Sequence, residues 1–589
     1  MTVEVFPGNK ADYPRTVVSI DTSRLGANST GGNKAIVVFG SAQNGVPNTV
    51  YHVSSYSQAK SVFKAGDLLD FIGMAWNPSA DFNGAGDIYA VRVDTAKQAF
   101  TEIGNLRINS KQYGQGANKV AVKLETGALP NSYKLTAMDT SSSLSQEIYD
   151  NMGIIANIKY TGLEKVARLS VKEGILTIKV GDTAEDLTPI IAYDLSSELY
   201  SSMDKVVSKL NVTGLVEASL VPQGDKAIDS IYLDDVEDKD ITEQPYTVTS
   251  LVGSMLGETK YSDLIEVELI REVAPKLTLT PSDTTITFAE AEAHTLPPVT
   301  TFPIRQLAGG SNGTVPGSWA SLFRLLQTNE TPSAYYVIPL TPNQAIHSEL
   351  ASFVTEMSGT GYPMRGIVGG GLGENLNKTL ARKEKLYNAR MALVGFDTKT
   401  SMPDGRIATM PAYMATAYVA GLASGLPVGE AVTYKPIKIN GLNRDYTSDQ
   451  LSTLHNAGVI VAKKERNTTS TNYRILSDVT TFNSENDPVS SEMSLGELSD
   501  FLGNSMREML DSKFIGTRTS SVTASTLKAE IGTFLLEKKN QGIIVRYEPT
   551  DISVSVTGEQ ANITCVVEPA RSLNKIEVGI IYDVSTQSV

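Results

Sequence analysis

The chain has 589 residues, of which 41% are hydrophobic and 20% charged, and its formal net charge is −14 at pH 7. This composition is typical of a globular protein with room for about four domains, and it excludes an intrinsically disordered chain. The acidic balance argues against a protein that binds nucleic acid or docks on an anionic membrane.

Side chains for metal or redox chemistry are scarce. The single cysteine, Cys565, lies in an alternating apolar run, so we expect a buried packing residue, and no disulfide can form within the chain. None of the four histidines stands at metal-ligand spacing from another histidine or from the cysteine: these are His52, His294, His347 and His455. We therefore predict no metal site and no cofactor.

No membrane or export segment is apparent in the sequence. The first ten residues lack the apolar core of a signal peptide, and no stretch reaches the ~18 apolar residues of a membrane span. Synthesis in a cytoplasm without membrane insertion is expected.

The first hundred residues predict an arm followed by the start of an α/β core. Residues 1–22 are expected to be extended, because Pro7 and Pro14 disfavour a helix. A β-branched run at residues 34–40 is typical of a buried strand, and residues 57–63 and 67–76 carry helical spacing. A further strand is predicted at residues 87–94.

Residues 101–300 have a different pattern. Valine, threonine and lysine alternate in short runs that are separated by turn pairs such as Glu173-Gly174 and Gly181-Asp182. Short strands at this spacing predict inserted β-sandwich or barrel-like domains. One helix is expected at residues 196–210, and the acidic stretch at residues 222–247 is interpreted as a solvated loop.

Residues 301–490 return to alternating strands and helices. Strands are predicted at residues 333–340, 364–368 and 390–395, joined by helices that begin at Thr341-Pro342 and at Glu374. Strands joined by helices of this length form a parallel sheet with right-handed crossovers. A helix rich in small residues at 408–426 is expected to be buried in a core or an interface.

Residues 491–571 are predicted to hold two amphipathic helices and a hairpin. Ser494 and Glu497 match a capping box at the start of the first helix, and the second helix is expected at residues 523–540. The hairpin turns at Gly558-Glu559. Residues 572–589 alternate apolar and polar side chains, and such a terminal strand can pair with its own sheet or with a neighbour's.

Two glycine-rich segments are candidate sites. Residues 309–313 match G-x-S-x-G, with Ser311 as a hydrolase nucleophile, but Pro316 and Gly317 delay the helix that a nucleophile elbow requires. Residues 369–373 lie between a strand and a helix, as a phosphate-binding turn does, but no Walker lysine follows, and Glu374 would place a carboxylate at the phosphate position. We interpret both as loops and predict no catalytic residue and no enzyme activity.

The order of short motifs along the second half of the chain is distinctive. These motifs are PIRQLAGGSNG at 303–313, MRGIVG at 364–369, PAYMATA at 411–417, RILSDVTTF at 474–482 and FIGTR at 514–518. In this order they resemble the contractile tail sheath protein of myophages, in the long form from phages of Gram-positive hosts. The resemblance covers the first hundred residues and the chain from about residue 300 onward, and the order of the motifs carries it.

The resemblance implies a fold and an arrangement of domains. The expected fold class is a mixed α/β and α+β multidomain protein, with a discontinuous α/β sheath core, inserted β-rich domains and extended arms at both ends. The expected parts are an N-terminal linking arm (1–22), the first part of the core (23–100), the β-rich insert (101–300), a central α/β sheath domain (301–490), a C-terminal sheath domain (491–571) and a C-terminal linking strand (572–589).

The resemblance also implies a function. Sheath subunits stack as hexameric rings around a tail tube and contract to drive the tube through the host envelope. The implied partners are neighbouring sheath subunits, the tail tube protein, and the baseplate and tail terminator proteins, without direct contact to nucleic acid or membrane. The implied location is the phage virion, after assembly in the host cytoplasm.

Two sets of residues follow as hypotheses. The extended, alternating termini would supply strands to neighbouring subunits through Val3, Val5, Val17, Ile20, Ile576, Val578, Ile580 and Tyr582. A helix of the C-terminal domain would contact the tube, with Lys538 and Lys539 as candidates. Three alternatives stay open: a serine hydrolase that uses Ser311, a nucleotide-driven motor, and the sheath of a bacterial contractile injection system.

Overall fold

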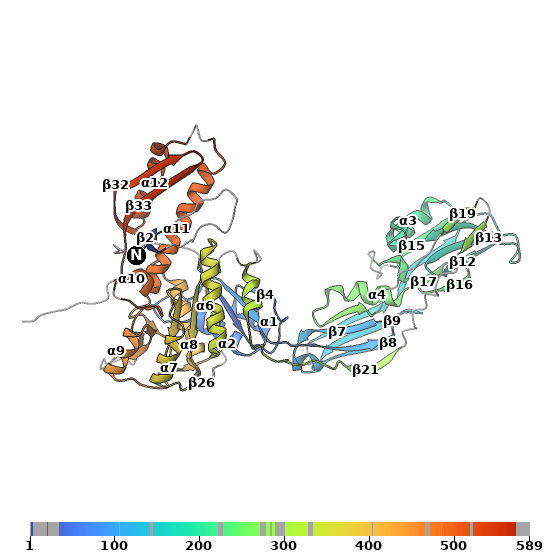
Figure 1. Ribbon diagram of the computed structural model, residues 1–589. Coiled ribbons are helices and arrows are strands. Elements are labelled where there is room, and N and C mark those ends of the chain that lie inside the picture. The colour runs from blue at the N-terminus through green and yellow to red at the C-terminus, as the bar shows by residue number, and fades with distance from the viewer. Residues whose placement is uncertain are drawn as a thin grey trace, which may run out of the picture. The chain divides into compact units, whose positions relative to one another are not determined.

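The computed structural model describes residues 2–3, 20–21, 34–104, 106–141, 145–221, 228–270, 279–282, 285–288, 301–327, 331, 334–402, 405–465, 472–484, 486–518 and 522–572. The chain divides into two compact units (Figure 1). The larger unit comprises Met1–Asp94 and Val315–Val589, and the inserted unit comprises Thr95–Thr314. The expected insert boundaries at residues 101 and 300 therefore fall inside the inserted unit.

A seven-stranded sheet forms the centre of the larger unit. Its order is β29 (Val459–Ile460), β24 (Met391–Val394), β23 (Arg365–Gly369), β22 (Ala334–Pro339), β3 (Ala35–Gly40), β5 (Ile88–Arg92) and β4 (Val50–Val53). All neighbouring strands pair in parallel except β4, which pairs antiparallel with β5. The predicted parallel sheet is confirmed, and β3 joins its two halves by pairing with both β22 and β5.

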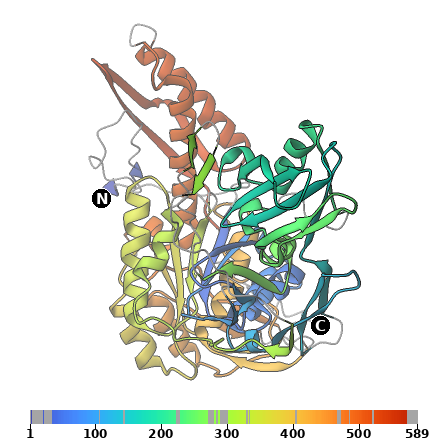
Figure 2. The same ribbon diagram turned by 90° about the vertical axis from the view of Figure 1, so that its right-hand side faces the viewer.

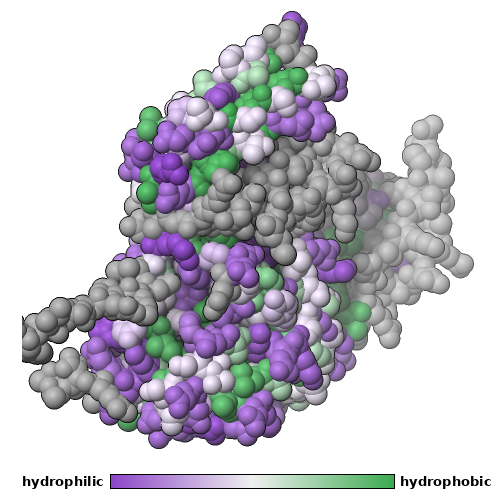
Figure 3. All heavy atoms as spheres, turned by 60° about the vertical axis from the view of Figure 1, so that its left-hand side comes forward, coloured by the Kyte–Doolittle hydropathy of each residue, from purple (hydrophilic) through white to green (hydrophobic). Residues whose placement is uncertain are grey.

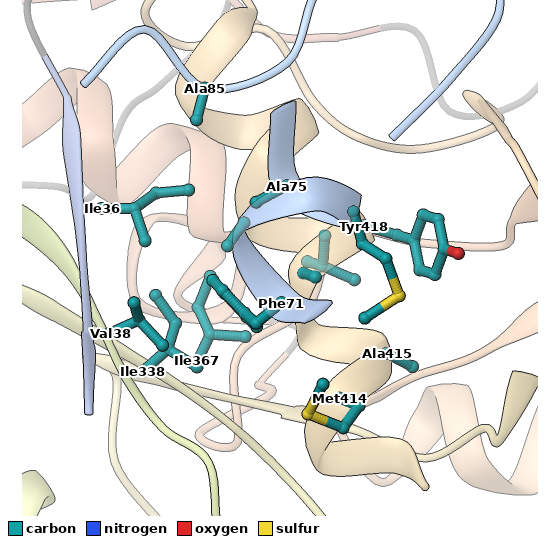
Figure 4. Packing of buried hydrophobic residues seen from close by; sticks show 14 of the residues in the cluster. Ile36, Val38, Phe71, Ala75, Ala85, Ile338, Ile367, Met414, Ala415 and Tyr418 are labelled. Carbon is teal, nitrogen blue, oxygen red and sulfur yellow. The ribbon is translucent and has the colours of Figure 1, made fainter. Parts of the chain in front are cut away.

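Helices cover both faces of this sheet because its strands are apolar on both sides. Ile36 and Val38 of β3 face a cluster that includes α1 (Tyr56–Phe63), α2 (Asp67–Trp76) and α8 (Ala412–Gly425). Figure 4 shows this side, with Phe71 and Ala75 of α2 and with Met414, Ala415 and Tyr418 of α8 packed near Ile338 and Ile367. The alternate residues of β3 pack against α5 (Ala320–Phe323), α6 (Gln344–Gly359) and α9 (Ser448–Asn456).

The helix rich in small residues, α8, is buried in the core. The sequence predicted burial in either a core or an interface, and the structure shows the first of these. A Cβ atom built on Gly421 would lie 2.4 Å from the carbonyl oxygen of Ala75 in α2. The two helices therefore approach so closely that only glycine fits at this position. Both α2 and α8 also contact β3, although the two helices lie far apart in the sequence.

Two helices between the parallel strands begin later than expected. The helix after β22, α6, begins at Gln344 with Asn343 as its N-cap, because the Asn343 side chain accepts a hydrogen bond from the Ala345 N–H. The next helix, α7 (Leu376–Glu384), is capped in the same way by Asn375. An asparagine just before each helix satisfies the free amides better than the Thr341-Pro342 pair does.

Short strands complete the larger unit. β25 (Thr398–Ser401) pairs with β26 (Ile407–Met410) and β28 (Gly441–Leu442), and β31 (Tyr473–Ile475) pairs with β27 (Pro436–Ile437) and β30 (Ala462–Lys464). The chain then runs through α10 (Pro488–Ser491), α11 (Met493–Phe514) and α12 (Ala524–Asn540) into the hairpin strands β32 (Ile544–Thr557) and β33 (Gln560–Pro569). Figure 2 presents the same elements turned by 90°.

The inserted unit is β-rich and holds two hydrophobic cores. One core lies between the sheet of β10 (Gln146–Met152), β9 (Tyr133–Asp139), β8 (Val120–Thr126) and β21 (Phe302–Gln306) and the sheet of β18 (Ile265–Leu269), β7 (Leu106–Tyr113) and β6 (Gln98–Ile103). Helix α4 (Leu251–Glu258) adds to it. A separate hairpin joins β19 (Leu279–Ser282) to β20 (Thr285–Phe288).

The second core has the same construction. It lies between the sheet of β14 (Thr188–Asp194), β13 (Ile175–Gly181), β12 (Val166–Lys172) and β16 (Val236–Asp240) and the sheet of β15 (Val216–Leu220), β11 (Ile154–Tyr160) and β17 (Tyr246–Thr249). Helix α3 (Met203–Val212) packs on it and begins seven residues later than expected. The β-rich character is confirmed, whereas a sandwich or barrel topology stays a prediction.

Part of the acidic stretch is a strand and not a loop. Residues 236–240 form β16, which pairs antiparallel with β12 at the edge of its sheet. The Arg168 guanidinium lies 2.7 Å from the Asp240 carboxylate across this pair. An edge position tolerates the acidic side chains because they point to solvent, and a cross-strand cation offsets part of their charge.

Candidate assembly surface

The C-terminal helix α12 and the hairpin share an apolar core with α11 (Figure 1). Thr523 caps α12 through a capping box, since its side chain accepts from the Thr526 N–H. Buried residues recur at helical spacing along α12, and they pack with residues of β32 such as Ile544 and Ile552. They are Leu527, Ile531, Phe534 and Leu535. The helix expected at residues 523–540 is thereby confirmed.

The hairpin presents long strands with open edges. β32 and β33 form a two-stranded sheet, which turns at Gly558 with a φ of 61°. Within the described residues each strand pairs only with the other, so both outer edges keep unpaired backbone N–H and C=O groups. Such edges are templates for an added strand. The expected hairpin is confirmed, with Ile544–Thr557 and Gln560–Pro569 as its strands on either side of the turn.

Exposed valines lie along the same hairpin. Val545, Val556 and Val566 are between 36% and 47% exposed. In Figure 3, hydrophobic residues are scattered among hydrophilic ones on the face shown. A partly exposed β-branched residue on a strand with an open outer edge adds apolar contact next to that edge, which favours pairing with another strand.

The predicted linking residues fall mostly outside the described residues. Val3 lies in β1 (Thr2–Val3) and Ile20 in β2 (Ile20–Asp21), and these two short strands pair antiparallel with Val3 opposite Ile20. The other six lie outside the described residues: Val5, Val17, Ile576, Val578, Ile580 and Tyr582. Their role in linking subunits stays a prediction.

The two candidate lysines on α12 differ in their surroundings. Lys538 is only 8% exposed, and its ammonium lies over the rings of Phe501 and Phe534, at 5.4 and 5.2 Å from their centroids. Its Nζ also donates to Gln541 Oε1 at 3.1 Å. Lys539 is exposed. Contact with a tube stays a prediction for both residues, and Lys539 is the one whose charge faces solvent.

Ser311 does not sit on a nucleophile elbow. Its backbone pairs with Lys97 in an antiparallel bridge, with hydrogen bonds of 2.8 and 3.3 Å. The following helix, α5, starts only at Ala320. Ser311 belongs to the inserted unit, whereas His347 and His455 belong to the larger unit.

His347 is a buried packing residue. Burial lowers the pKa of His347 to about 4, and its Nε2 donates to the Thr341 carbonyl oxygen at 2.8 Å. The other ring nitrogen, Nδ1, is the one that could accept a proton, and it is buried without a hydrogen-bond partner among the described residues, so no nucleophile is in its reach. The geometry of residues 309–313 is that of a loop fastened to its neighbours by backbone hydrogen bonds.

The glycine-rich turn at residues 369–373 is filled by carboxylates of the chain itself. Glu374 Oε1 accepts from the Gly371 N–H at 2.9 Å, and Asp397 Oδ2 accepts from the Gly373 N–H at 2.7 Å. The Arg382 guanidinium pairs with Glu374, and together with the turn amides it holds the pKa of Glu374 below its usual value although burial opposes this. The amides that a phosphate would need are thus occupied.

No metal centre or membrane span emerges among the described residues. In that part of the chain, no group of three or more His, Cys, Asp and Glu side chains is gathered to hold a metal ion. No helix of the described part is long and apolar enough to cross a membrane.

The sequence reasoning missed a buried cluster of charges beneath α11. The Asp500 carboxylate accepts hydrogen bonds from Arg365 (3.1 Å), Arg390 (2.8 Å) and the Tyr335 hydroxyl (2.7 Å). Burial opposes its ionisation, but the two arginines outweigh burial and hold the pKa of Asp500 below its ordinary value. One turn earlier, Glu497 accepts from Lys34 at 2.8 Å.

The expected capping box is wrong, and the cluster explains why. Helix α11 begins at Met493, so Ser494 lies inside its first turn and Glu497 turns inward to Lys34 instead of back to the helix start. The Ser494 N–H is capped by Asp478, whose Oδ2 accepts it at 2.9 Å. The only signal in the sequence was acidic residues at positions 497 and 500 on the apolar side of an amphipathic helix.

Comparison with known proteins places these features in a family. Residues 333–481 match the model of the phage tail sheath protein central domain. A putative tail sheath protein of Enterococcus phage phiEF24C is 39% identical over 99% of both chains, and the tail sheath protein of Staphylococcus phage Twort is 37% identical over 99% of both. A crystal structure of a sheath tail protein from Desulfitobacterium hafniense has the same fold, with a TM-score of 0.54 at 13% identity, covering 93% of this chain and 96% of that one.

Proposed function

Because this chain belongs to the phage tail sheath proteins, we propose that it is the structural subunit of a contractile tail sheath, stacked as hexameric rings around the tail tube. Contraction of these rings drives the tube through the host cell envelope. The observation that carries the proposal is the β32–β33 hairpin, whose two open edges can accept strands from neighbouring subunits. The similarity to phage proteins along the whole chain favours a phage tail over the sheath of a bacterial injection system.

Strand addition suits a sheath that rearranges. A strand added to β32 or β33 would be held by backbone hydrogen bonds, which do not depend on how the compact bodies pack. The arms at residues 1–22 and 572–589 are the proposed donors, through the alternating residues named above. The bodies can then shift between two discrete packings while the links persist.

Energy for contraction would come from the difference between those packings and not from a reaction. The glycine-rich turn supports this, because Glu374 and Asp397 occupy the amides that a nucleotide phosphate would need. Ser311, bridged to Lys97, supports a subunit without hydrolase activity. We therefore propose a non-enzymatic protein that needs no cofactor.

The proposed partners follow from this role. Neighbouring sheath subunits bind through the arms and hairpin, and the tube is contacted by α11 or α12, with Lys539 as the exposed candidate. Baseplate and terminator proteins close the two ends of the stack. The subunit assembles in the host cytoplasm and ends in the virion, and its net charge of −14 keeps it from binding the DNA that passes through the tail.

Electron microscopy of the purified full-length chain tests the proposal. Ring stacks or helical tubes are expected at high protein concentration, and monodisperse particles under every condition would contradict a sheath subunit. Chains lacking residues 1–22 or residues 572–589 are expected to stay soluble and to form no tubes. Normal tubes from both deletions would contradict strand linking and leave the sheath assignment intact.

A further inference from the structure

A buried lysine, Lys34, fixes the start of the larger unit's sheet, and we call it the N-terminal root because the proposed arm (residues 1–22) lies on its N-terminal side. Lys34 precedes β3 by one residue and is only 6% exposed. Its Nζ donates to the Leu426 carbonyl oxygen and to Glu497 Oε1, both at 2.8 Å. Lys34 is therefore bonded both to α11 and to the segment that follows α8.

The root of the C-terminal arm is fixed to the same two segments. The Arg571 guanidinium lies 3.6 Å from Glu492, the N-cap of α11, and the Ser572 hydroxyl accepts from the Ala431 N–H at 3.1 Å. These are the last two residues that the structure describes at this end. The two roots, more than five hundred residues apart in sequence, are thus both bonded to the N-terminal part of α11 and to residues 426–431.

Glu497 joins the two anchors. Its Oε1 accepts from Lys34 and, at 3.2 Å, from the Gly429 N–H, and its Oε2 accepts from the Tyr336 hydroxyl. Residues 426–431 are therefore bonded to the N-terminal root and to α11 through Glu497, and to the C-terminal root through Ser572. We call this set the arm-root junction: Lys34, residues 426–431, Glu492, Glu497, Arg571 and Ser572.

Helix α11 is held closely against the sheet at this point. A Cβ atom on Gly496 would lie 2.1 Å from Arg365 Nη2, so the guanidinium of β23 fills the space that any other residue would need. The junction also contains the buried ion pair Lys34–Glu497. Separating these two side chains would leave each with an uncompensated buried charge. Small, independent movements of the two segments are therefore unfavourable, and a coordinated rearrangement is favoured.

We propose that the arm-root junction couples the two arms, so that displacing one root shifts α11 and loosens the other root. Within a sheath, such coupling would pass a change in one subunit from the neighbour on one arm to the neighbour on the other. That use rests on the function proposed above. The coupling itself is a property of the single chain and is tested there.

Hydrogen exchange of the soluble full-length chain, with Lys34→Met, Arg571→Met and the double variant, tests the coupling. Lys34→Met is expected to raise amide exchange at residues 427–432 and 566–572 by at least about fivefold, although residues 566–572 do not contact Lys34. In the double variant, the increase in exchange rate is expected to exceed that of the stronger single variant by less than about twofold. The reason is that a junction already opened by one substitution is opened little further by the second.

Two further variants keep the test decisive. Lys34→Met combined with Glu497→Gln removes the ion pair without leaving a buried charge, so it is expected to fold and still to raise exchange at residues 566–572. Lys513→Met is the matched control, because Lys513 pairs with Glu530 on the half-exposed side of α11, and it is expected to leave residues 427–432 and 566–572 unchanged.

Two outcomes would overturn the proposal. One is an increase confined to residues 34–40 in the Lys34 variants, and the other is a double variant whose effect equals the product of the single effects. Both outcomes are measured by hydrogen exchange on the isolated, soluble chain. A failure of the chain to form tubes is a separate result, and it would count against the proposed function alone.

Discussion

Asp478 is a buried carboxyl group whose ionisation destabilises the larger unit. Its Oδ2 caps α11 by accepting from the Ser494 N–H, while its Oδ1 is buried and has no hydrogen-bond partner among the described residues. Burial raises the pKa of Asp478 to about 6, and the Glu497 carboxylate adds to the rise, whereas the Ser494 contacts and Arg365 lower it. Glu492 is a further carboxyl group in its electrostatic surroundings.

We expect Asp478→Asn to stabilise the protein at high pH and not at low pH. The folded pKa lies above the ordinary value of 3.8, so the stability that the protonated carboxyl contributes is present below pH ~4 and is lost as the pH rises through ~6. At pH 8 the variant should gain about 1–3 kcal/mol in free energy of unfolding. Thermal unfolding at pH 8 and pH 4 measures this.

The control for this prediction is Asp186→Asn, which changes an exposed aspartate in the inserted unit. It is expected to leave both unfolding temperatures unchanged. An equal gain from Asp478→Asn at both pH values would mean that the carboxylate is not the cause, since a protonated Asp478 resembles asparagine.

Residue by residue, the sequence allowed the local features to be predicted and not the long-range ones. The helix that follows Thr523 was predicted, because the apolar residues that recur at helical spacing all lie within the segment itself. The Lys34–Glu497 pair joins residues 463 positions apart, and Glu497 had a plausible local role that the fold does not use. A buried charge becomes recognisable only when its partner is known.

The close packing of α2 against α8 depends on Gly421, which has no side chain. Gly421→Ala would put a methyl group 2.4 Å from the Ala75 carbonyl oxygen, so the helices must separate. We expect the free energy of unfolding to fall by about 1–3 kcal/mol. Denaturant titration followed by circular dichroism measures the change.

A second glycine provides the matched control on a helix. Gly532 lies within α12, and a Cβ there would meet only the tip of Ile552, at 3.9 Å. Gly532→Ala is expected to raise the free energy of unfolding by about 0.5–1 kcal/mol, because alanine restricts the unfolded chain and favours the helix. If both alanine variants destabilised alike, close packing at Gly421 would not be the explanation.

At the scale of helices and strands, those with a regular hydrophobic periodicity could be predicted from the sequence and the others could not. The parallel order β22, β23 and β24 could be predicted because each strand and helix carries its own pattern and short links restrict the topology. For an edge strand, by contrast, no local sequence pattern indicates which strand it pairs with. The acidic β16 resembled a loop because its side chains are polar on both sides, and only pairing with β12 makes it a strand.

For the molecule as a whole, the open hairpin is the feature that should control assembly. Val556→Lys and Val566→Lys place a charge on an exposed strand without disturbing the core. Because a lysine on an edge strand opposes the addition of another strand, we expect both variants to fold normally and to form few or no tubes. Circular dichroism and electron microscopy give the two readouts.

Val212→Lys is the control for these variants. Val212 ends α3 in the inserted unit and is 80% exposed, so the same change in charge and size occurs away from the hairpin. Tubes are expected to form as in the unmodified protein. Loss of tubes in all three variants would point to the added charge itself and not to the hairpin edge.

The central position of β3 has a consequence for how the protein is made. β3 ends at Gly40 and β22 begins at Ala334, so about 290 residues, which take roughly 15–60 s to translate, leave the ribosome before β3 can pair with β22, one of its two partners. During that interval the whole inserted unit emerges and can fold by itself, while β3, whose residues are all apolar, is not yet paired with β22. The nascent chain therefore needs protection, from a chaperone or from early pairing with β5, at a stage when most of its length already exists.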